Sequence, residues 1–318
     1  MRIVIALGGN ALLERGEGPD AAIQRRHVRR AATALAHLAT DHQLIVCHGN
    51  GPQVGLLAQE SENDPALSQP YPLDVLGAQT QGMIGYWLVQ ELHNAGAPAV
   101  AVLSRTVVDA DDSAFATPTK FIGPGYDERR ARAIADRRGW RIGRDGERWR
   151  RVVASPEPRR IVEMDTLAAL AERGGVVVCG GGGGAPVVES RDGRLDGVEA
   201  VVDKDLTAAL LALRLGAQRL LVLTDVPAVM RDYGTPVASP VRTVDVDTLA
   251  GLRFPAGSMA PKVDACVRFV RASGHPAAIG ALDDAPAVLA GTSGTTVVPA
   301  AGSTGSTHRT ARNGGGNG

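Results

Sequence analysis

Lysine is scarce in this sequence. Only three of the 34 basic residues are lysines, Lys120, Lys204 and Lys262, which leaves 31 arginines. Because arginine serves wherever a general surface cation is needed, these three positions indicate sites where a compact ammonium works and a planar guanidinium does not. Chance placement is the alternative, but Lys204 and Lys262 fall at the starts of expected helices, where phosphate binds well. The lysines therefore predict a phosphate site.

Other absences exclude whole classes of protein. The formal net charge is zero and no long basic stripe occurs, so nucleic-acid binding has no electrostatic support. No stretch reaches the ~18 consecutive apolar residues that a membrane helix needs. Residues 1–7 are too short for a signal peptide, so they predict a first strand and a cytoplasmic protein. Aromatic residues make up only 3%, so the core must consist of Ala, Val, Leu and Ile.

Cysteine is also rare. Cys47, Cys179 and Cys266 lie far apart and show no metal-ligand spacing. An odd count argues against a disulfide framework. We expect three buried free thiols, because free cysteine usually packs as a small apolar side chain.

Short apolar runs recur along the chain without clean alternation, as in strands that are buried on both faces. They cover residues 3–7, 44–47, 99–103, 176–179, 220–223 and 295–298. Helical patterns lie between them, over residues 23–38, 74–96, 206–216 and 261–274. Strands that alternate with helices predict an α/β fold, with a mostly parallel sheet covered on both sides.

Residues 111–163 interrupt this alternation. They are rich in Arg, Asp, Gly and Pro, and Trp140 and Trp149 are their main apolar anchors. So few apolar residues cannot support an independent domain, and the segment predicts a flap subdomain inserted in the main fold. Residues 300–318 contain almost nothing to bury, so we expect a disordered tail.

Two glycine-rich segments follow the first two predicted strands. They are Gly8-Gly9-Asn10-Ala11 and His48-Gly49-Asn50-Gly51-Pro52-Gln53-Val54-Gly55. Ligands bind at the carboxyl edge of parallel strands, so both are candidate loops for binding a small anion through backbone amides. A plain turn from strand to helix is the alternative for the first. His48 could act as a base, but a lone histidine at a strand end is more often structural.

A third glycine run, Gly180-Gly181-Gly182-Gly183-Gly184, matches the dinucleotide fingerprint if Ala185 takes its last position. That fingerprint needs a helix immediately afterwards, whereas residues 186–189 indicate another extended segment, so a Rossmann site is disfavoured. No Walker loop occurs. Asp205, beside Lys204, is a candidate for orienting ammonium groups or helping to hold Mg²⁺. A charge that complements the helix dipole is the plainer interpretation.

Together these segments resemble the carbamate kinase family, within the amino-acid kinase superfamily. The matching stretches follow the family's order up to about residue 299, and they are Ala6-Leu7-Gly8-Gly9-Asn10-Ala11-Leu12, residues 48–55, Pro72-Leu73-Asp74-Val75, Pro118-Thr119-Lys120, Trp149-Arg150-Arg151-Val152-Val153, Ser155-Pro156, residues 181–184 with Pro186-Val187, residues 197–205, Leu223-Thr224-Asp225-Val226, Gly257-Ser258-Met259 and Pro261-Lys262-Val263.

The resemblance implies a three-layer αβα sandwich over residues 1–299 that forms a homodimer. An acyl-substrate lobe would cover residues 1–195, with the flap at 111–163, and a nucleotide lobe would cover residues 196–299. The family's catalytic group would be Lys120, Lys204, Asp205 and Lys262. Carbamate would bind at Gly8, Gly9, Asn10, His48, Gly49, Asn50 and Gly51. ATP or ADP, with Mg²⁺ on its phosphates and no certain metal ligand from the chain, would bind at Gly181, Gly182, Thr224, Asp225, Tyr233 and Met259.

One position separates the carbamate kinases from their relatives. Related kinases that form acyl phosphates carry a lysine where this chain has Ala6, and in carbamate kinases the flap lysine, here Lys120, supplies that cation. The chain departs from the family pattern at Phe121, at Gly125 and at residues 227–230, so the adenine side of the site is the least defined.

The resemblance implies reversible phosphoryl transfer between ATP and carbamate, used to make ATP in arginine catabolism. The alternatives are another acyl-phosphate or nucleotide kinase of the same fold, and a non-catalytic metabolite-binding or regulatory protein. Ala6 and the flap disfavour the first, and the three retained lysines beside Asp205 disfavour the second.

Overall fold

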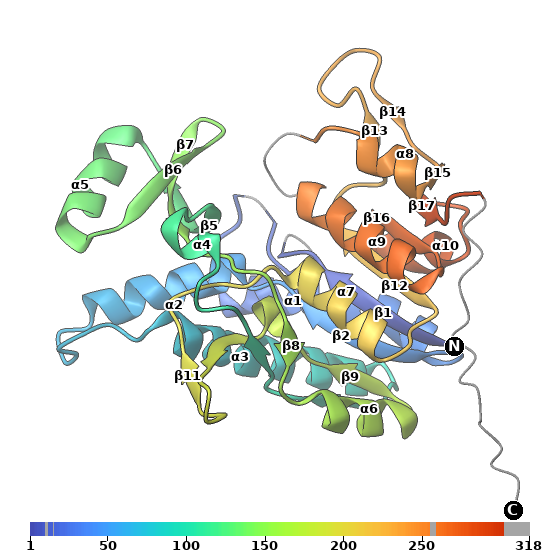
Figure 1. The fold of residues 1–318 in the computed structure, drawn as a ribbon, viewed down its shortest axis with the longest axis horizontal. Helices are drawn as coiled ribbons and strands as arrows, with labels where there is room; N and C mark the ends of the chain where they lie inside the picture. The colour runs from blue at the N-terminus through green and yellow to red at the C-terminus, as the bar shows by residue number, and fades with distance from the viewer. Residues whose placement is uncertain (10–11, 15, 255–258, 302–318) are drawn as a thin grey trace, which may run out of the picture.

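The central feature of the fold is one eight-stranded sheet. A computed structural model describes residues 1–9, 12–14, 16–254 and 259–301. The strands are all parallel to β1 except β15 and β17, which run the opposite way (Figure 1). Their order across the sheet is β15 (Thr243–Asp245), β17 (Thr295–Val298), β16 (Ala277–Ala281), β12 (Arg219–Thr224), β1 (Arg2–Leu7), β2 (Gln43–His48), β9 (Val176–Val178) and β3 (Ala99–Ala101).

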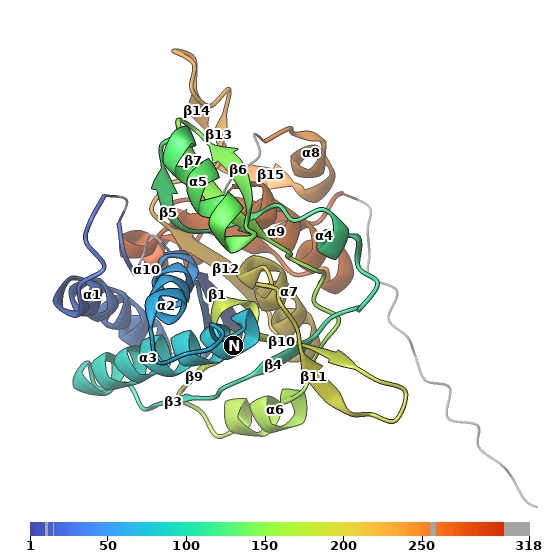
Figure 2. The ribbon, with the colours of Figure 1, turned by 90° about the vertical axis from the view of Figure 1, so that its left-hand side faces the viewer.

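Helices cover both faces of this sheet, because its central strands are apolar on both sides. In β1, Ile3, Ile5 and Leu7 pack on one face and Val4 and Ala6 on the other. The first face is covered by α1 (Ala21–Ala39), α3 (Leu73–Asn94) and α10 (Ala285–Leu289), and the second by α6 (Met164–Glu172), α7 (Lys204–Arg214), α8 (Val246–Gly251) and α9 (Met259–Ser273). Figure 2 shows α1 and α3 on one side of β1 and α7 on the other. The predicted three-layer αβα arrangement is confirmed.

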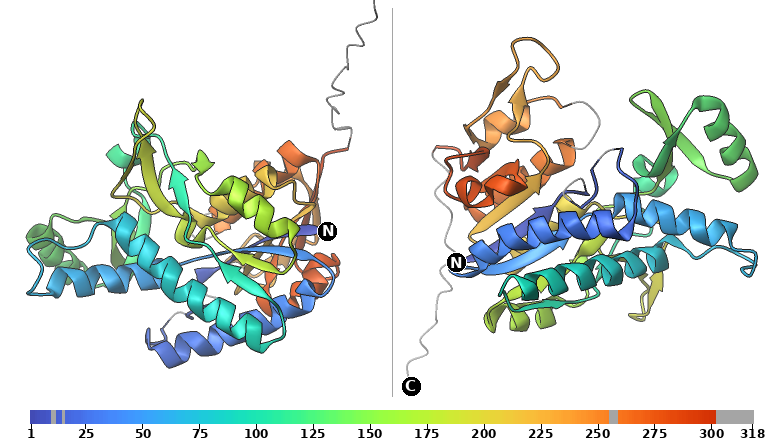
Figure 3. Two further views of the ribbon diagram at one scale, coloured as in Figure 1. Left: turned by 90° about the horizontal axis from the view of Figure 1, so that it is seen from below. Right: turned by 180° about the vertical axis from the view of Figure 1, so that it is seen from behind.

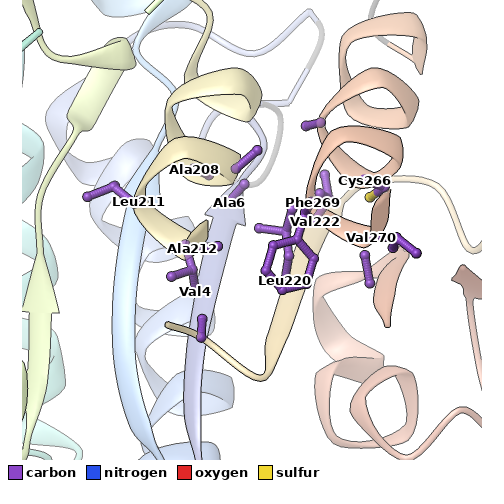
Figure 4. Packing of buried hydrophobic residues seen from close by; sticks show 14 of the residues in the cluster. Val4, Ala6, Ala208, Leu211, Ala212, Leu220, Val222, Cys266, Phe269 and Val270 are labelled. Carbon is purple, nitrogen blue, oxygen red and sulfur yellow. The ribbon is translucent and has the colours of Figure 1, made fainter. Parts of the chain in front are cut away.

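The side chains that α7 and α9 bury against the central sheet hold the first turn of each helix in place. Small side chains of α7 lie against β1, and Phe269 of α9 lies against β12 (Figure 4). Fully burying a side chain of the size of Leu or Phe contributes roughly 1.5–3 kcal/mol. Lys204, the first residue of α7, and Lys262, in the first turn of α9, are therefore attached to a rigid core.

Smaller sheets complete the fold. A four-stranded sheet contains β11 (Leu195–Gly197), β10 (Ala185–Glu189), β4 (Arg105–Val107) and β8 (Arg160–Ile161). The flap contains β5 (Lys120–Tyr126), β7 (Arg148–Val153) and β6 (Arg141–Asp145), with α4 (Ser113–Ala116) before them and α5 (Glu128–Arg138) between β5 and β6. A hairpin is formed by β13 (Met230–Arg231) and β14 (Ser239–Pro240). Figures 1 and 3 show flap and hairpin rising from the same side of the central sheet.

Most predicted elements are present, with two corrections. The strand predicted at 99–103 ends at Ala101, and residues 51–55, predicted as loop, begin the helix α2 (Gly51–Asn63). Pro52 suits the first turn of a helix, where no backbone donor is needed. Glycine is needed at position 55 of α2 because a Cβ there would overlap the backbone of Gly123 in the flap. Gly55 therefore marks a close approach of the α2 backbone to the flap backbone, and not a longer loop.

All three cysteines are free and buried, as predicted. Ala300, the first residue of the predicted tail, packs against the core, and residues 302–318 lie outside the described part of the chain. Within the described residues, none of the helices has the length and apolar character needed to span a membrane.

Candidate active site

The first glycine loop and the end of β12 meet because β1 and β12 are neighbours in the sheet. The Gly8 N–H donates to the Leu223 carbonyl over 2.8 Å. A Cβ at Gly8 would lie 3.2 Å from the Thr224 Oγ1 atom, and Thr224 donates to an Asp225 carboxylate oxygen over 2.9 Å. The structure thus brings a predicted substrate-binding residue against the predicted nucleotide residues. Asn10, predicted beside them, lies outside the described residues.

The second glycine loop also reaches this point. A Cβ on Gly49 would lie 2.9 Å from the Gly9 nitrogen and 3.3 Å from the Lys204 Cε atom. Only a residue without a side chain fits so closely between them. Gly9, Gly49 and Lys204 therefore converge at the carboxyl edge of the central sheet.

Lys204 and Lys262 share one carboxylate. The Lys204 Nζ donates to Asp205 Oδ1 over 2.6 Å, and the Lys262 Nζ donates to Asp205 Oδ2 over 3.1 Å. All three side chains are buried. Asp205 therefore orients two ammonium groups, which is the first of the roles considered for it from the sequence.

Lys120 reaches the same helix start from the flap. Its Nζ donates to Asp203 Oδ2 over 2.8 Å, while Asp203 Oδ1 caps α7 by accepting from the N–H groups of Asp205 and Leu206. The Lys120 side chain is 24% exposed. The three lysines of the chain, separated by up to 142 positions (262 − 120), thus meet on two adjacent carboxylates at the first turn of α7.

These charges shift one another's pKa values. Burial raises the pKa of Asp203, but the nearby Lys120 and Lys204 outweigh it and hold that pKa well below its usual range. Burial lowers the pKa of Lys204, but Asp205 and Asp203 raise it above its ordinary value. Burial and the charge of Lys204 leave the pKa of Lys262 below its ordinary value. Lys262 is therefore the easier of the two buried lysines to deprotonate.

His48 and Asn50 form a packed wall beside this cluster. The Nδ1 atom of His48 hydrogen-bonds to the Gly49 carbonyl over 2.9 Å, and burial lowers the His48 pKa to about 4. Asn50 donates to the Thr80 hydroxyl over 2.9 Å. A Cβ on Gly181 would overlap His48, and one on Gly182 would overlap Asn50. Gly181 and Gly182, predicted to bind nucleotide, therefore lie against the predicted substrate segment that ends at Gly51.

Tyr233 and Met259 are the remaining residues that were predicted to bind nucleotide, and Met259 is three positions before Lys262 in the first turn of α9. Tyr233 lies between β13 and β14 and is 75% exposed, and Met259 is the first residue of α9. Their part in nucleotide binding stays a prediction. The described residues contain no group of three or more His, Cys, Asp or Glu that could hold a metal ion.

Asp203 was not among the residues predicted for the site, yet it contacts both Lys120 and the start of α7. An aspartate directly before a helix is the usual signal for a cap, and Asp203 stands in that position before α7. Its second oxygen is the partner of Lys120, and this pairing depends on the position of the flap.

Comparison with known proteins agrees with this geometry. Residues 1–281 match the model of the amino acid kinase family. The chain is 50% identical over 303 residues to a carbamate kinase of Rhizobium meliloti, and the alignment covers 93% of each chain. Solved carbamate kinases of Giardia lamblia share 35% identity, over 94% of this chain and 98% of theirs, with TM-scores of 0.89 for the citric acid complex and 0.84 for the AMP-PNP complex. The chain belongs to the amino acid kinase family and, within it, to the carbamate kinases, which are ATP-dependent phosphotransferases.

Proposed function

We propose that this chain transfers a phosphoryl group reversibly between ATP and carbamate, giving ADP and carbamoyl phosphate. The observation that carries the proposal is the meeting of Lys120, Lys204 and Lys262 at the first turn of α7, beside the two glycine loops. A helix start with three adjacent ammonium groups is suited to a transferred phosphate.

The chemistry needs charge and placement more than proton transfer. In the forward direction a carbamate oxygen attacks the γ-phosphorus of ATP, and the bond to the ADP oxygen breaks, so ADP leaves with the electron pair. Carbamate is already an anion, so no general base is required. This agrees with His48, which is buried and uncharged at neutral pH. The barrier is repulsion between two anions, and fixed cations aligned with the transfer lower it.

The three lysines would divide this work. Asp205 holds Lys204 and Lys262 in place on the rigid core, whereas Asp203 holds Lys120 on the flap. The γ-phosphate would replace part of these carboxylate contacts as it enters. Carbamate would lie near Gly8, Gly9 and Gly49, and the adenosine part would extend past Thr224 and Asp225 toward Tyr233 and Met259.

We expect Mg²⁺ to enter with the nucleotide. Mg²⁺ in kinase sites is held by one or two carboxylates, by water and by substrate phosphates. Asp203 and Asp205 are the carboxylates at the start of α7, where we propose that the phosphate binds, and both already bind lysines. The bound cation would add charge stabilisation on the phosphates. The AMP-PNP complex of the Giardia lamblia relative supports the use of ATP and ADP.

We also propose a homodimer that works in the cytoplasm in arginine breakdown. Large apolar side chains are exposed on the edge strand β3, on the segment that follows it and on the adjacent helix α3, with Val100 40% exposed, Leu103 53% and Tyr86 62%. Exposed apolar edges of this kind favour association. Light scattering of the purified chain should give twice the 33.0 kDa chain mass, and Leu103→Glu should shift it toward the monomer.

The direct test of the proposed function is an assay for ATP formed from ADP and carbamoyl phosphate. We expect ATP formation that depends on both substrates. No ATP from carbamoyl phosphate, together with turnover of acetyl phosphate or another acyl phosphate, would overturn the substrate assignment and favour a different kinase of the same fold.

A further inference from the structure

A partly buried carboxylate on α2 accepts hydrogen bonds or pairs with side chains from three parts of the flap. Glu62 is only 10% exposed, yet it accepts hydrogen bonds from Trp140 Nε1 at 3.1 Å and Arg151 Nη1 at 3.0 Å, and it pairs with Arg138. The guanidinium groups of Arg138 and Arg151 also lie 5.3 and 5.0 Å from the centroid of the Trp140 ring. Charge-assisted hydrogen bonds are the strong ones, and a carboxylate that is largely withdrawn from water depends on them.

The rest of the same face of α2 also contacts the flap. Gln59 bonds to Tyr126, and Asn63 accepts from Arg138 over 2.6 Å. Gly55 meets the backbone of Gly123 so closely that no side chain fits there. Residues 55, 59, 62 and 63 follow the spacing of one helix face. One stripe of α2 is therefore shaped for the flap along two turns.

The contact between Glu62 and the flap lies close to Lys120 in the flap sheet. Arg151, which Glu62 binds, pairs with Ile122 of β5, and Val153, two residues further along β7, pairs with Lys120. Two residues of a strand span about 7 Å. A shift of the flap on α2 would therefore move the Lys120 ammonium relative to Asp203.

The other end of α2 begins at the substrate segment. The helix starts at Gly51, directly after His48, Gly49 and Asn50, and Glu62 lies 11 positions after Gly51. At 1.5 Å per residue this is a rigid span of about 16 Å. The same helix thus joins the proposed carbamate loop to the part of the flap that carries Lys120.

We propose that Glu62 is a positioning residue for phosphoryl transfer, which fixes the flap on α2 so that Lys120 stands at the α7 start. The inference rests on the proposed function for the role of Lys120, but the docking of the flap is independent of it. Glu62 does not touch the reacting groups. It acts through the placement of Lys120.

The docking is tested by hydrogen–deuterium exchange of the full chain, which needs no turnover. Glu62→Gln keeps the shape of the side chain and removes its charge, so we expect faster exchange of the β5 and β7 amides and unchanged exchange of β1. Glu60→Gln, on the exposed face of the same helix, is the control and should leave both unchanged. Unaltered flap exchange in Glu62→Gln would overturn the proposal.

The positioning role is tested by a double-mutant cycle in the ATP-forming assay. We expect Glu62→Gln to lower kcat between about ten- and a hundredfold in the wild-type background, as a misplaced reacting group does. In a Lys120→Ala background the same change should lower kcat less than about twofold, because nothing remains to be positioned. Equal losses in both backgrounds would overturn the inference. Absence of ATP formation by the wild-type chain would instead contradict the proposed function, and the exchange result would still stand.

Discussion

Two charged regions of this molecule use different cations. At the start of α7, three lysines meet Asp203 and Asp205, and no arginine is bonded to either carboxylate in the described part of the chain. At the flap, arginines surround Glu62 and stack on Trp140. Residues 120–153 contain ten arginines and one lysine against five acidic residues, a net charge of 11 − 5 = +6.

The difference follows from the geometry of the two cations. A guanidinium is a planar fork that binds a carboxylate while it stacks on an aromatic ring, which suits a permanent contact between two structural elements. An ammonium is a compact charge that can turn from a carboxylate to an entering phosphate. Arginine therefore fixes the flap, and lysine is kept where a partner must change during the reaction.

The largest effect should follow from breaking this division in the lysine cluster. We expect Lys120→Arg and Lys262→Arg to keep the fold and to lower kcat about a hundred- to a thousandfold, since one lost transition-state donor costs ~3–4 kcal/mol. The ATP-forming assay measures kcat, and circular dichroism checks the fold. Wild-type turnover in both variants would show that the shape of the cation does not matter there.

Acid should lower the stability of the protein through His48, in the packed wall beside the lysines. The arginines of the flap stay charged over the same pH range and should not contribute. His48 has a pKa of about 4 when folded and 6.5 as a model value, so the unfolded chain binds the extra proton first as the pH falls. The free energy of unfolding should drop by about 3 kcal/mol between pH 6.5 and 4. Asp203 does not contribute to this change between pH 6.5 and 4. Its pKa is lowered, so the stability that it provides is lost only at lower pH.

Urea titrations across this pH range measure the effect. His48→Gln should flatten the slope, and His275→Gln, at an exposed site, should leave it unchanged. A slope that survives in His48→Gln would assign the acid sensitivity to another group.

Gly55→Ala should disturb the contact between α2 and the flap without changing any charged residue. A Gly→Ala change inside a helix usually stabilises by roughly 0.5–1 kcal/mol, but here the new Cβ meets the Gly123 backbone. We expect faster exchange in the flap and about a tenfold lower kcat. Gly77→Ala in α3, where a Cβ meets nothing within 4 Å, is the control and should be neutral or stabilising.

The smallest effect should come from Arg151→Lys. The charge near Glu62 is kept, but the stacking on Trp140 is lost, which costs about 1 kcal/mol of flap docking. Exchange of β7 measures this cost, with the exposed Arg129→Lys as the control. If Arg151→Lys lowered kcat as much as Lys262→Arg does, the contrast between the two regions would be lost.

The sequence predicted the layers of this fold because its central strands are apolar on both faces. Residues 3–7 and 220–223 form neighbouring strands of the sheet. The start of α2 was missed because Gly51 and Gly55 look like loop residues, and the reason for Gly55 is Gly123, which lies 68 positions away.

The site was predictable in its parts but not in its assembly. The scarcity of lysine identified Lys120, Lys204 and Lys262, but only the folded chain shows that they meet on two adjacent aspartates. Glu62 carried no signal, since its partners lie more than 70 positions along the chain. Side-chain pairs of this kind depend on how the flap packs, and local sequence patterns do not contain that information.

The central claim is that a compact ammonium at the flap acts on the transferred phosphate. Because the Lys120 side chain is 24% exposed, small cations in solution should reach the space that Lys120→Ala leaves. The decisive measurement is the kcat of Lys120→Ala for ATP formation with added methylammonium or guanidinium. We predict that methylammonium restores part of the lost turnover and guanidinium does not. Equal restoration by guanidinium, or full turnover without either cation, would contradict the account.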